Sequence, residues 1–195
     1  MARYTSLDPN KYILIRQAAM DLFYQHGVDN TNMQQIATAA GIAKGTIYLY
    51  YNSREDLLEN IFNYCLDLHI EASMNDVEAQ NSCSEKLKKR VKNILVWNYE
   101  NPKEASFIST YYKPINVVGT DNVSFTRSYD INKSILKEGI ERGEFIDLPL
   151  TYLCTVFFSS VEGISTYVRK NHHVFQEEGL LEGMLETIVA GFKKS

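Results

Sequence analysis

Two short helical patterns joined at a glycine are the feature that most restricts how this chain can fold. The stretch 31–58 reads TNMQQIATAAGIAKGTIYLYYNSREDLL, with one pattern over 32–40 and a second over 44–50. Each pattern spaces apolar residues as one face of a helix requires. Gly41 lies between them and permits a tight turn, because glycine adopts a left-handed backbone at little cost. The sequence therefore predicts a helix-turn-helix.

Helical periodicity continues through the remainder of the chain. An apolar face runs over 10–26 and stops at Gly27, and a further helix is expected to begin at Ser53 and to continue unbroken. No alternating apolar and polar stretch is bounded by hairpin turns, so a sheet is not expected. The predicted fold is all-α with about nine helices. A three-helix DNA-binding domain over 1–53 is followed by a helical effector-binding and dimerisation domain over 54–195.

The two predicted domains differ in charge. Residues 1–54 hold five basic and three acidic side chains, a net charge of +2, whereas residues 55–195 hold 15 basic and 21 acidic side chains, a net charge of −6. A polyanionic partner such as DNA is attracted to positive surface. The N-terminal domain is therefore the expected site of DNA contact, although the whole chain is acidic.

The compartment is predicted from the N-terminus and the cysteines. The first residues, MARYTSLDPNKY, lack the apolar segment of a secretory signal, and no apolar run is long enough to span a membrane. Cys65, Cys83 and Cys154 are far apart and have no zinc-finger spacing. We expect reduced thiols, no metal or cofactor, no membrane partner, and a cytoplasmic protein.

A longer series of residues surrounds the helix-turn-helix at characteristic positions. The series comprises Ile15, Arg16, Gln17, Ala18, Ala19, Met20, Asp21, Leu22, Phe23, Gly27, Thr31, Ile36, Ala37, Ala40, Gly41, Ile42, Lys44, Gly45, Thr46, Ile47, Tyr48, Tyr50 and Tyr51. In order and spacing it resembles the TetR family, densely over 12–58. Ala43 departs from the family pattern, in which a Ser or Thr often caps the recognition helix, and Arg16 stands where an apolar residue is common. The resemblance implies a dimeric, one-component transcription regulator.

The expected DNA contacts centre on the second helix of the motif. Gly45 allows the backbone to approach a base, Lys44 can bond guanine or phosphate, and Thr46 offers a hydroxyl and a methyl group. The resemblance implies that Tyr48 and Tyr50 bond phosphates. The expected DNA-binding residues are Thr31, Gln34, Lys44, Gly45, Thr46, Tyr48, Tyr50 and Arg54. The alternative, that the apolar and aromatic residues here are core, is adopted for Ile47 and Tyr51.

An aromatic cluster in the second domain is the expected effector site. Clusters of this size can line an apolar cavity, but aromatic residues at helical spacing are more often packing. The expected ligand-binding residues are Trp97, Phe107, Tyr111, Phe125, Tyr129, Phe158 and Glu162. Asn132 is a further candidate for polar orientation of the ligand. The basic run over 86–92 is interpreted as a solvated helix face.

The two most apolar helical patterns lie at the C-terminal end. An antiparallel hairpin of this kind can dock on its copy as a four-helix bundle about a two-fold axis. The expected dimer-interface residues are Phe157, Val161, Ile164, Leu181, Met184, Leu185 and Ile188. The alternative is that both stripes pack inside one protomer.

These observations predict a sequence-specific DNA-binding regulator, and exclude the common catalytic motifs. The sequence has no GxSxG, HExxH or phosphate-binding loop, so an enzyme is not expected. The expected partners are double-stranded operator DNA, a second copy of the chain, and an unidentified small apolar or aromatic effector that releases the repressor. A helical protein-protein adaptor without operator binding is the alternative.

Overall fold

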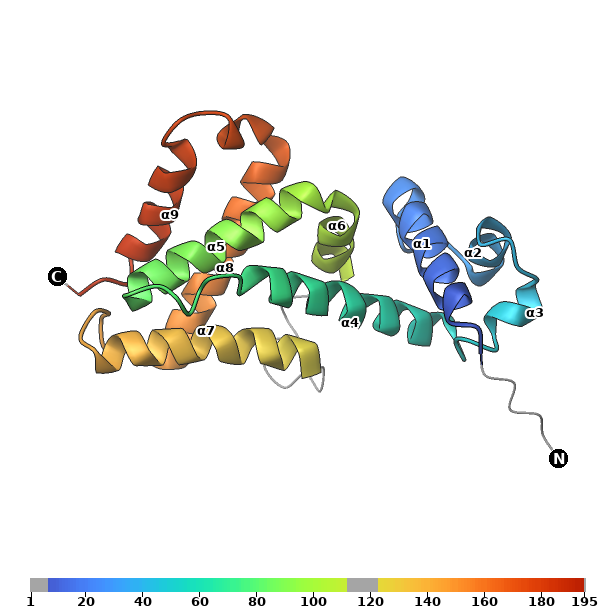
Figure 1. The fold of residues 1–195 in the computed structure, drawn as a ribbon, viewed down its shortest axis with the longest axis horizontal. Coiled ribbons are helices and arrows are strands. Elements are labelled where there is room, and N and C mark those ends of the chain that lie inside the picture. The colour runs from blue at the N-terminus through green and yellow to red at the C-terminus, as the bar shows by residue number, and fades with distance from the viewer. Residues whose placement is uncertain (1–6, 112–122, 195) are drawn as a thin grey trace. The chain divides into compact units, whose positions relative to one another are not determined.

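The computed structural model describes residues 7–111 and 123–194, with only the backbone described for 123–125. Its elements are α1 (Pro9–His26), α2 (Met33–Ala39), α3 (Lys44–Ile47), α4 (Arg54–Ser73), α5 (Cys83–Glu100), α6 (Pro102–Tyr111), α7 (Val123–Glu141), α8 (Leu150–Lys170), the 3-10 helix η2 (His172–Phe175) and α9 (Leu180–Ala190) (Figure 1). Within the described residues, strand-like pairing is limited to one isolated bridge between Phe145 and Lys193. The all-α prediction is confirmed.

Local signals in the sequence set the N-terminal helices. The Asp8 carboxylate accepts the Asn10 amide at 2.9 Å, and Pro9 occupies the first turn of α1, where its missing N–H is not needed. Asn32 caps α2 in a reciprocal box with Gln35. Both helices end within one residue of the predicted positions. The third is shorter than predicted, because after Ile47 the chain continues as a hydrogen-bonded turn.

The described chain divides into two compact units, and neither is one continuous stretch. Of the described residues, the first unit contains 7–65 and 102–111, and the second contains 66–101 and 123–194. Helix α6 thus belongs with α1, where Phe107 stacks on Phe23 with ring centroids 5.3 Å apart. The functional boundary predicted between residues 53 and 54 remains a prediction.

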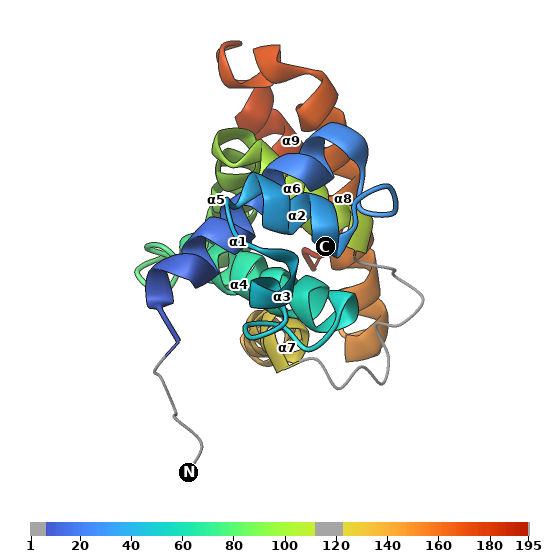
Figure 2. The ribbon, with the colours of Figure 1, turned by 90° about the vertical axis from the view of Figure 1, so that its right-hand side faces the viewer.

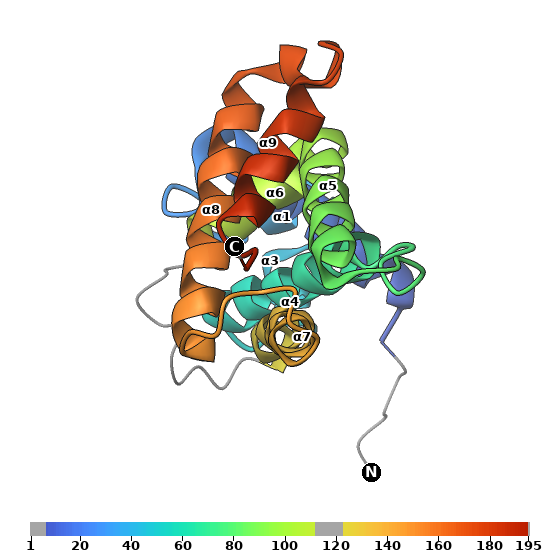
Figure 3. The ribbon, with the colours of Figure 1, turned by 90° about the vertical axis from the view of Figure 1, so that its left-hand side faces the viewer.

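The second unit is built around α5. This helix packs against α7, α8 and α9, and α8 also contacts α7 and α9. Figure 3 shows α9 flanked by α8 and α5. The buried core includes Leu87, Val91 and Leu95 of α5, which lie on one helical stripe. No helix among the described residues is long and apolar enough to cross a membrane.

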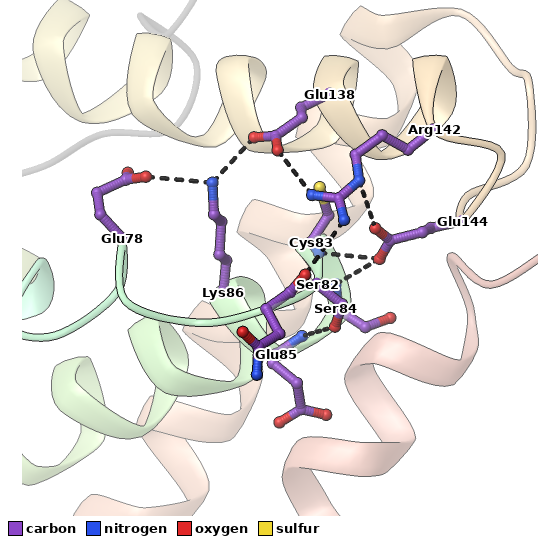
Figure 4. A network of polar contacts seen from close by, with 10 residues as sticks. Glu78, Ser82, Cys83, Ser84, Glu85, Lys86, Glu138, Arg142 and Glu144 are labelled. Atoms are coloured by element: carbon purple, nitrogen blue, oxygen red, sulfur yellow. Dashed lines mark hydrogen bonds and ion pairs between the residues drawn. The ribbon is translucent and has the colours of Figure 1, made fainter.

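A network of charged groups holds the N-terminal end of α5, which we call the anchored end of α5 (residues 82–88; Figure 4). A Glu144 carboxylate oxygen accepts the backbone N–H groups of Cys83 at 2.8 Å and Ser84 at 3.3 Å. Lys86 lies 3.0 Å from Glu138. The hydrogen bond from Lys86, with that from Arg142, lowers the pKa of the Glu138 carboxyl. A negative charge at a helix N-terminus is favourable, so this network stabilises the start of α5.

The basic run over 86–92 is not the solvated face that the sequence predicts. The Lys86 and Lys88 side chains are only 12% and 11% exposed, and each has carboxylate partners, the nearest to Lys88 being Glu85 and Glu186, both at 2.6 Å. Arg90 is fully buried. The correction follows from position, because Arg90 shares the helical stripe of Leu87 and Val91.

Three of the residues predicted at a dimer interface are already used inside the protomer. Phe157, Leu185 and Ile188 are 1%, 1% and 6% exposed and belong to the core of the second unit. This part of the interface prediction is wrong, because these side chains have almost no surface left for a partner. The remaining four, Val161, Ile164, Leu181 and Met184, are partly exposed.

Candidate nucleic-acid interface

A glycine turn and two inward residues position the recognition helix α3. Gly41 has φ +67°, a conformation that an L side chain adopts only with strain. The turn is closed by the Ile42 amide, which donates to the Ala37 carbonyl at 3.0 Å. Ile47 is fully buried and Tyr51 is 2% exposed. The prediction that these last two residues are core is confirmed.

The opposite face of α3 and the turn after it are open to solvent. Lys44 and Gly45 are exposed, and Tyr48 and Leu49 expose 45% and 65% of their surface. Within the described parts of the chain, Lys44 forms no ion pair with any acidic side chain. Figure 2 views the molecule with α3 and its flanking turns toward the reader. The tip of α3 (residues 44–49) therefore offers one positive charge, hydroxyl groups and apolar surface.

Leu49 is a candidate contact that the sequence analysis missed. Its side chain lies outside the stripe of Ile47 and Tyr51 and is the most exposed large apolar side chain of the described residues. The signal was present in the sequence, since a leucine two residues from each of two core positions faces away from the core. Such a side chain can pack against a thymine methyl group.

Gly45 is needed neither for packing nor for backbone conformation. A Cβ atom built on it would meet nothing within 4 Å, and its φ is not in the left-handed region. A glycine inside a helix costs about 1 kcal/mol relative to alanine. The stretch of bare backbone thus faces solvent at the tip of α3, where a partner can approach closely.

Tyr50 is partly used inside the first unit. Its ring packs edge-on against Tyr12, with centroids 4.8 Å apart, and its hydroxyl accepts the Asp8 amide at 3.2 Å. The hydroxyl proton is left for another acceptor. Its predicted phosphate contact therefore stays a prediction, in a geometry fixed by Tyr12.

The phosphate contacts predicted for Thr31 and Arg54 need correction. Thr31 is 3% exposed, and its hydroxyl donates to the Gly27 carbonyl at 2.9 Å. Arg54 donates from Nε to the Thr31 carbonyl at 3.1 Å and from Nη2 to the Val28 carbonyl at 2.5 Å. Both residues instead fix the start of α4 to the loop before α2. They are positioning residues for the motif.

Another predicted contact, Gln34, lies exposed on α2, and Thr46 on α3 is partly exposed. Its amide nitrogen is 3.3 Å from the Thr38 hydroxyl, one turn along the same helix. This interaction is local and on the surface, so Gln34 stays available to a partner. Its contact with DNA remains a prediction.

The predicted ligand-binding residues are divided between the two units. Trp97, Tyr129, Phe158 and Glu162 belong to the second unit, whereas Phe107 and Tyr111 belong to the first. Phe107 is 3% exposed and lies between the rings of Phe23 and Tyr111. The ring is part of the packing of α6 on α1, so its assignment to an effector cavity stays a prediction. The side chain of Phe125 lies outside the described residues.

Two of the second-unit candidates have partners within the chain. Glu162 lies 3.6 Å from Arg169, and Tyr129 shares a hydrogen bond with the Cys154 thiol. Trp97 is 9% exposed and meets the His69 ring edge-on at 5.0 Å. The described residues contain no group of three or more side chains that could hold a metal ion.

The helix-turn-helix also matches a known family. The family model described as bacterial regulatory proteins of the tetR family matches residues 15–61, which span most of α1 to the first half of α4. Residues 15–61 therefore form a TetR-family DNA-binding domain. The predicted membership is thereby confirmed, as is the predicted role of a sequence-specific DNA-binding transcriptional regulator.

Relatives extend the likeness beyond this motif. The fatty acid metabolism regulator protein of Bacillus subtilis (strain 168) is 26% identical over 185 residues, which cover 93% of this chain and 95% of the relative. A TetR-family transcription regulator from Marinobacter aquaeolei VT8 has the same fold, with a TM-score of 0.75, 19% identity and coverage of 95% and 96% of the two chains.

A third likeness is to a liganded structure. The transcriptional regulator FadR from Bacillus subtilis, crystallised in complex with stearoyl-CoA, matches with a TM-score of 0.70 and 24% identity, over 92% of this chain and 98% of FadR. At this identity the comparison establishes a shared fold.

Proposed function

We propose that this TetR-family chain is a repressor that binds operator DNA as a homodimer through the tip of α3 and is released by an acyl-chain effector. The observation that carries the DNA-binding part is the solvent-exposed, bare backbone at Gly45, next to the Lys44 ammonium, which has no acidic partner among the described residues. A short recognition helix reaches base edges only through its N-terminal turn. The tip of α3 has the surface that this contact requires.

Each exposed group of the tip has a distinct role in this proposal. The backbone at Gly45 comes against a base edge, and Lys44 bonds guanine or phosphate. Tyr48, which is 45% exposed, donates its hydroxyl to a phosphate. Phosphate contacts fix the register of the protein on the duplex, whereas base contacts carry the specificity.

The dimer places two copies of α3 in successive major grooves, about 34–36 Å apart. Its interface uses the outer faces of α8 and α9, where Val161, Ile164, Leu181 and Met184 keep accessible surface. Two-fold symmetry then matches the protein to a palindromic operator.

The acyl effector is supported by one sequence comparison and one structural comparison, both with Bacillus subtilis proteins. The Bacillus subtilis relative that aligns along nearly the whole chain is a fatty acid metabolism regulator, and the similar FadR structure contains stearoyl-CoA. Helix α4 begins at Arg54, which is tied to the helix-turn-helix, and continues without a break past His69 of the second unit. A coupling of about 1–3 kcal/mol between effector and operator changes DNA affinity by roughly 5- to 150-fold.

The test of DNA binding combines two variants that change the tip of α3 in opposite ways. Lys44→Ala with Tyr48→Phe removes two exposed contacts, and Gly45→Ala adds a methyl group to open space. Both should lower affinity for the promoter DNA beside the gene, about tenfold or more. Gly45→Ala should leave the melting temperature unchanged or raise it, since alanine favours a helix. Fluorescence anisotropy in fixed salt measures affinity, and calorimetry measures stability.

The matched control is Lys92→Ala, which removes an exposed lysine of the second unit. It should leave operator affinity unchanged. Full affinity in both tip variants would overturn the placement of α3 on DNA. If the wild-type chain binds no DNA from its own promoter region, the adaptor function replaces repression. Addition of palmitoyl-CoA should release the wild-type protein, and failure to do so would remove the acyl effector.

A further inference from the structure

Arg90 of α5 is a buried positive charge with almost no partner. Its side chain is fully buried in the second unit, and Nη2 donates to the Ser128 hydroxyl of α7 at 3.3 Å. Among the described residues, Nε and Nη1 have no hydrogen-bond acceptor. Burial lowers the pKa of the guanidinium to about 10, so it remains charged at neutral pH. A guanidinium has five N–H donors, and one described acceptor serves only one of them.

Two more unpartnered polar atoms lie on the elements around Arg90. Nδ1 of His69 on α4 and Oδ1 of Asn132 on α7 are buried and have no partner in the described chain. Burial, and then the nearby charge of Arg90, lower the pKa of His69 to about 4. The imidazole is therefore neutral at physiological pH. Asn132 follows Ser128 by one turn on the same face of α7.

A buried, unpaired charge beside two unpaired polar atoms destabilises the fold unless a ligand binds there. An unpaired charge taken out of water costs several kcal/mol, and buried polar atoms are paired in the great majority of cases. The other buried cation of the described residues, Lys88 on the same helix, has three carboxylates within 4 Å. The polar cluster of His69, Arg90, Ser128 and Asn132 thus has the composition of a binding site for an anion, with neutral donor and acceptor groups beside the cation.

We propose that Arg90 anchors the anionic head group of the effector inside the second unit. The inference rests on the proposed function, in which the effector carries an acyl chain. The head group is a carboxylate or a phosphate, which accepts N–H donors from the guanidinium in charge-assisted hydrogen bonds. His69 and Asn132 bond the remaining polar atoms of the ligand, and the edge-on Trp97 ring borders the cluster.

The test compares three probes that share one hydrocarbon chain: palmitate, palmitoyl-CoA and hexadecanol. Binding to the full-length, ligand-stripped protein is measured by calorimetry for the wild type, Arg90→Met, Arg90→Lys and Lys92→Met. Arg90→Met should weaken the anionic probe about tenfold or more, the effect of losing a charged hydrogen bond. The same substitution should change the affinity for hexadecanol by no more than about twofold, because the hydrocarbon contacts are kept. Arg90→Lys should recover part of the affinity, and Lys92→Met should have none of these effects.

The two anionic probes identify the source of the head group. Sensitivity of palmitate to Arg90→Met assigns a carboxylate, and sensitivity of palmitoyl-CoA alone assigns a phosphate. Equal weakening of anionic and neutral probes would overturn the inference, because it would make Arg90 a packing residue. Unchanged affinity for both anions would also overturn it.

A failure of the acyl effector itself is recognised separately. If no probe binds the wild type, the proposed effector class is wrong, and the ligand-free proteins decide the role of Arg90. Arg90→Met should then melt at a higher temperature than the wild type, because methionine removes a desolvated charge. A lower melting temperature, with Lys92→Met unchanged, would show that the guanidinium stabilises the fold and would overturn the anion site.

Discussion

Positive side chains at the anchored end of α5 are paired with carboxylates, whereas the one in the next turn of the same helix is not. Lys86 and Lys88 extend to carboxylates of neighbouring elements, and the helix N-terminus is capped by Glu144. Arg90 is buried deeper and has only a hydroxyl acceptor among the described residues. Ion pairs that are complete within the chain stabilise its fold, whereas a buried charge left incomplete indicates a partner from outside.

The same distinction applies to the DNA-binding tip. Residues 86–92 hold five basic side chains, yet most are paired or buried, while α3 holds a single lysine without an acidic partner in the described chain. The density of basic residues along a sequence therefore does not locate a DNA-binding surface. Exposure and the absence of internal partners locate it better.

The largest expected effect concerns the turn that carries Glu144 to the anchored end. A Cβ atom on Gly139 would lie 2.1 Å from Cδ2 of the buried Phe145 ring. Gly139→Ala should displace that ring and cost about 3 kcal/mol, at the upper end of overpacking effects. Urea unfolding of the ligand-free protein measures the loss.

Gly191→Ala is the matched control for this change. Its Cβ atom would lie 3.7 Å from the Ile188 carbonyl oxygen, an ordinary contact, and its φ of −64° suits alanine. The control should change stability by no more than about 0.5–1 kcal/mol. Equal stability of the two variants would contradict the close packing of Phe145 on α7.

The second expected effect is a change of stability with pH that comes from His69 of the polar cluster. The pKa of His69 is lowered from 6.5 to about 4, so the unfolded state binds a proton before the folded state does. Its contribution to stability is complete above about pH 6.5 and is lost as the pH falls toward 4, by roughly 2–3 kcal/mol.

The variant His69→Phe isolates this contribution. Phenylalanine cannot take up a proton, so the difference in unfolding free energy between variant and wild type should shift in favour of the variant between pH 6.5 and pH 4. Denaturant unfolding at several pH values measures the difference. A difference that is constant with pH would show that His69 is not buried in a neutral form.

The smallest expected effect tests whether the ion pairs at the anchored end of α5 stabilise the fold. Lys88→Met leaves Glu85 and Glu186 without their shared cation, and should lower the melting temperature by about 2–4 °C. The control Lys92→Met removes an exposed side chain and should have no effect. A melting temperature for Lys88→Met as high as that of the wild type would mean that these ion pairs contribute nothing.

Periodicity and turn residues were sufficient to predict much of the N-terminal fold. Gly27 and Gly41 both have positive φ where the chain turns, and Ile47 is buried as its spacing indicates. These features are local, because the backbone needs of a turn and the period of a helix are readable within a few residues. The exposed tip of α3 follows from them.

The features that the sequence analysis did not predict depend on contacts between distant segments of the chain. Arg54 donates to the backbone carbonyl of Thr31, 23 residues earlier in the chain, which the motif alone does not indicate. Phe107 joins α1 across more than eighty residues of chain. The burial of Arg90 was nevertheless predictable from the sequence, since Arg90 lies three residues after Leu87 and four before Ile94 on an apolar stripe. The surrounding lysines concealed that pattern.

The return of α6 to the helix-turn-helix unit matters for anyone who builds chimeric regulators. Exchange of the first fifty or so residues between two proteins of this class would transplant Phe23 without the Phe107 ring that covers it, and Asp21 without Lys103. The recipient's own sixth helix would have to fit a foreign surface. A graft that carries residues 102–111 together with the N-terminal helices keeps the contacts between α1 and α6 intact.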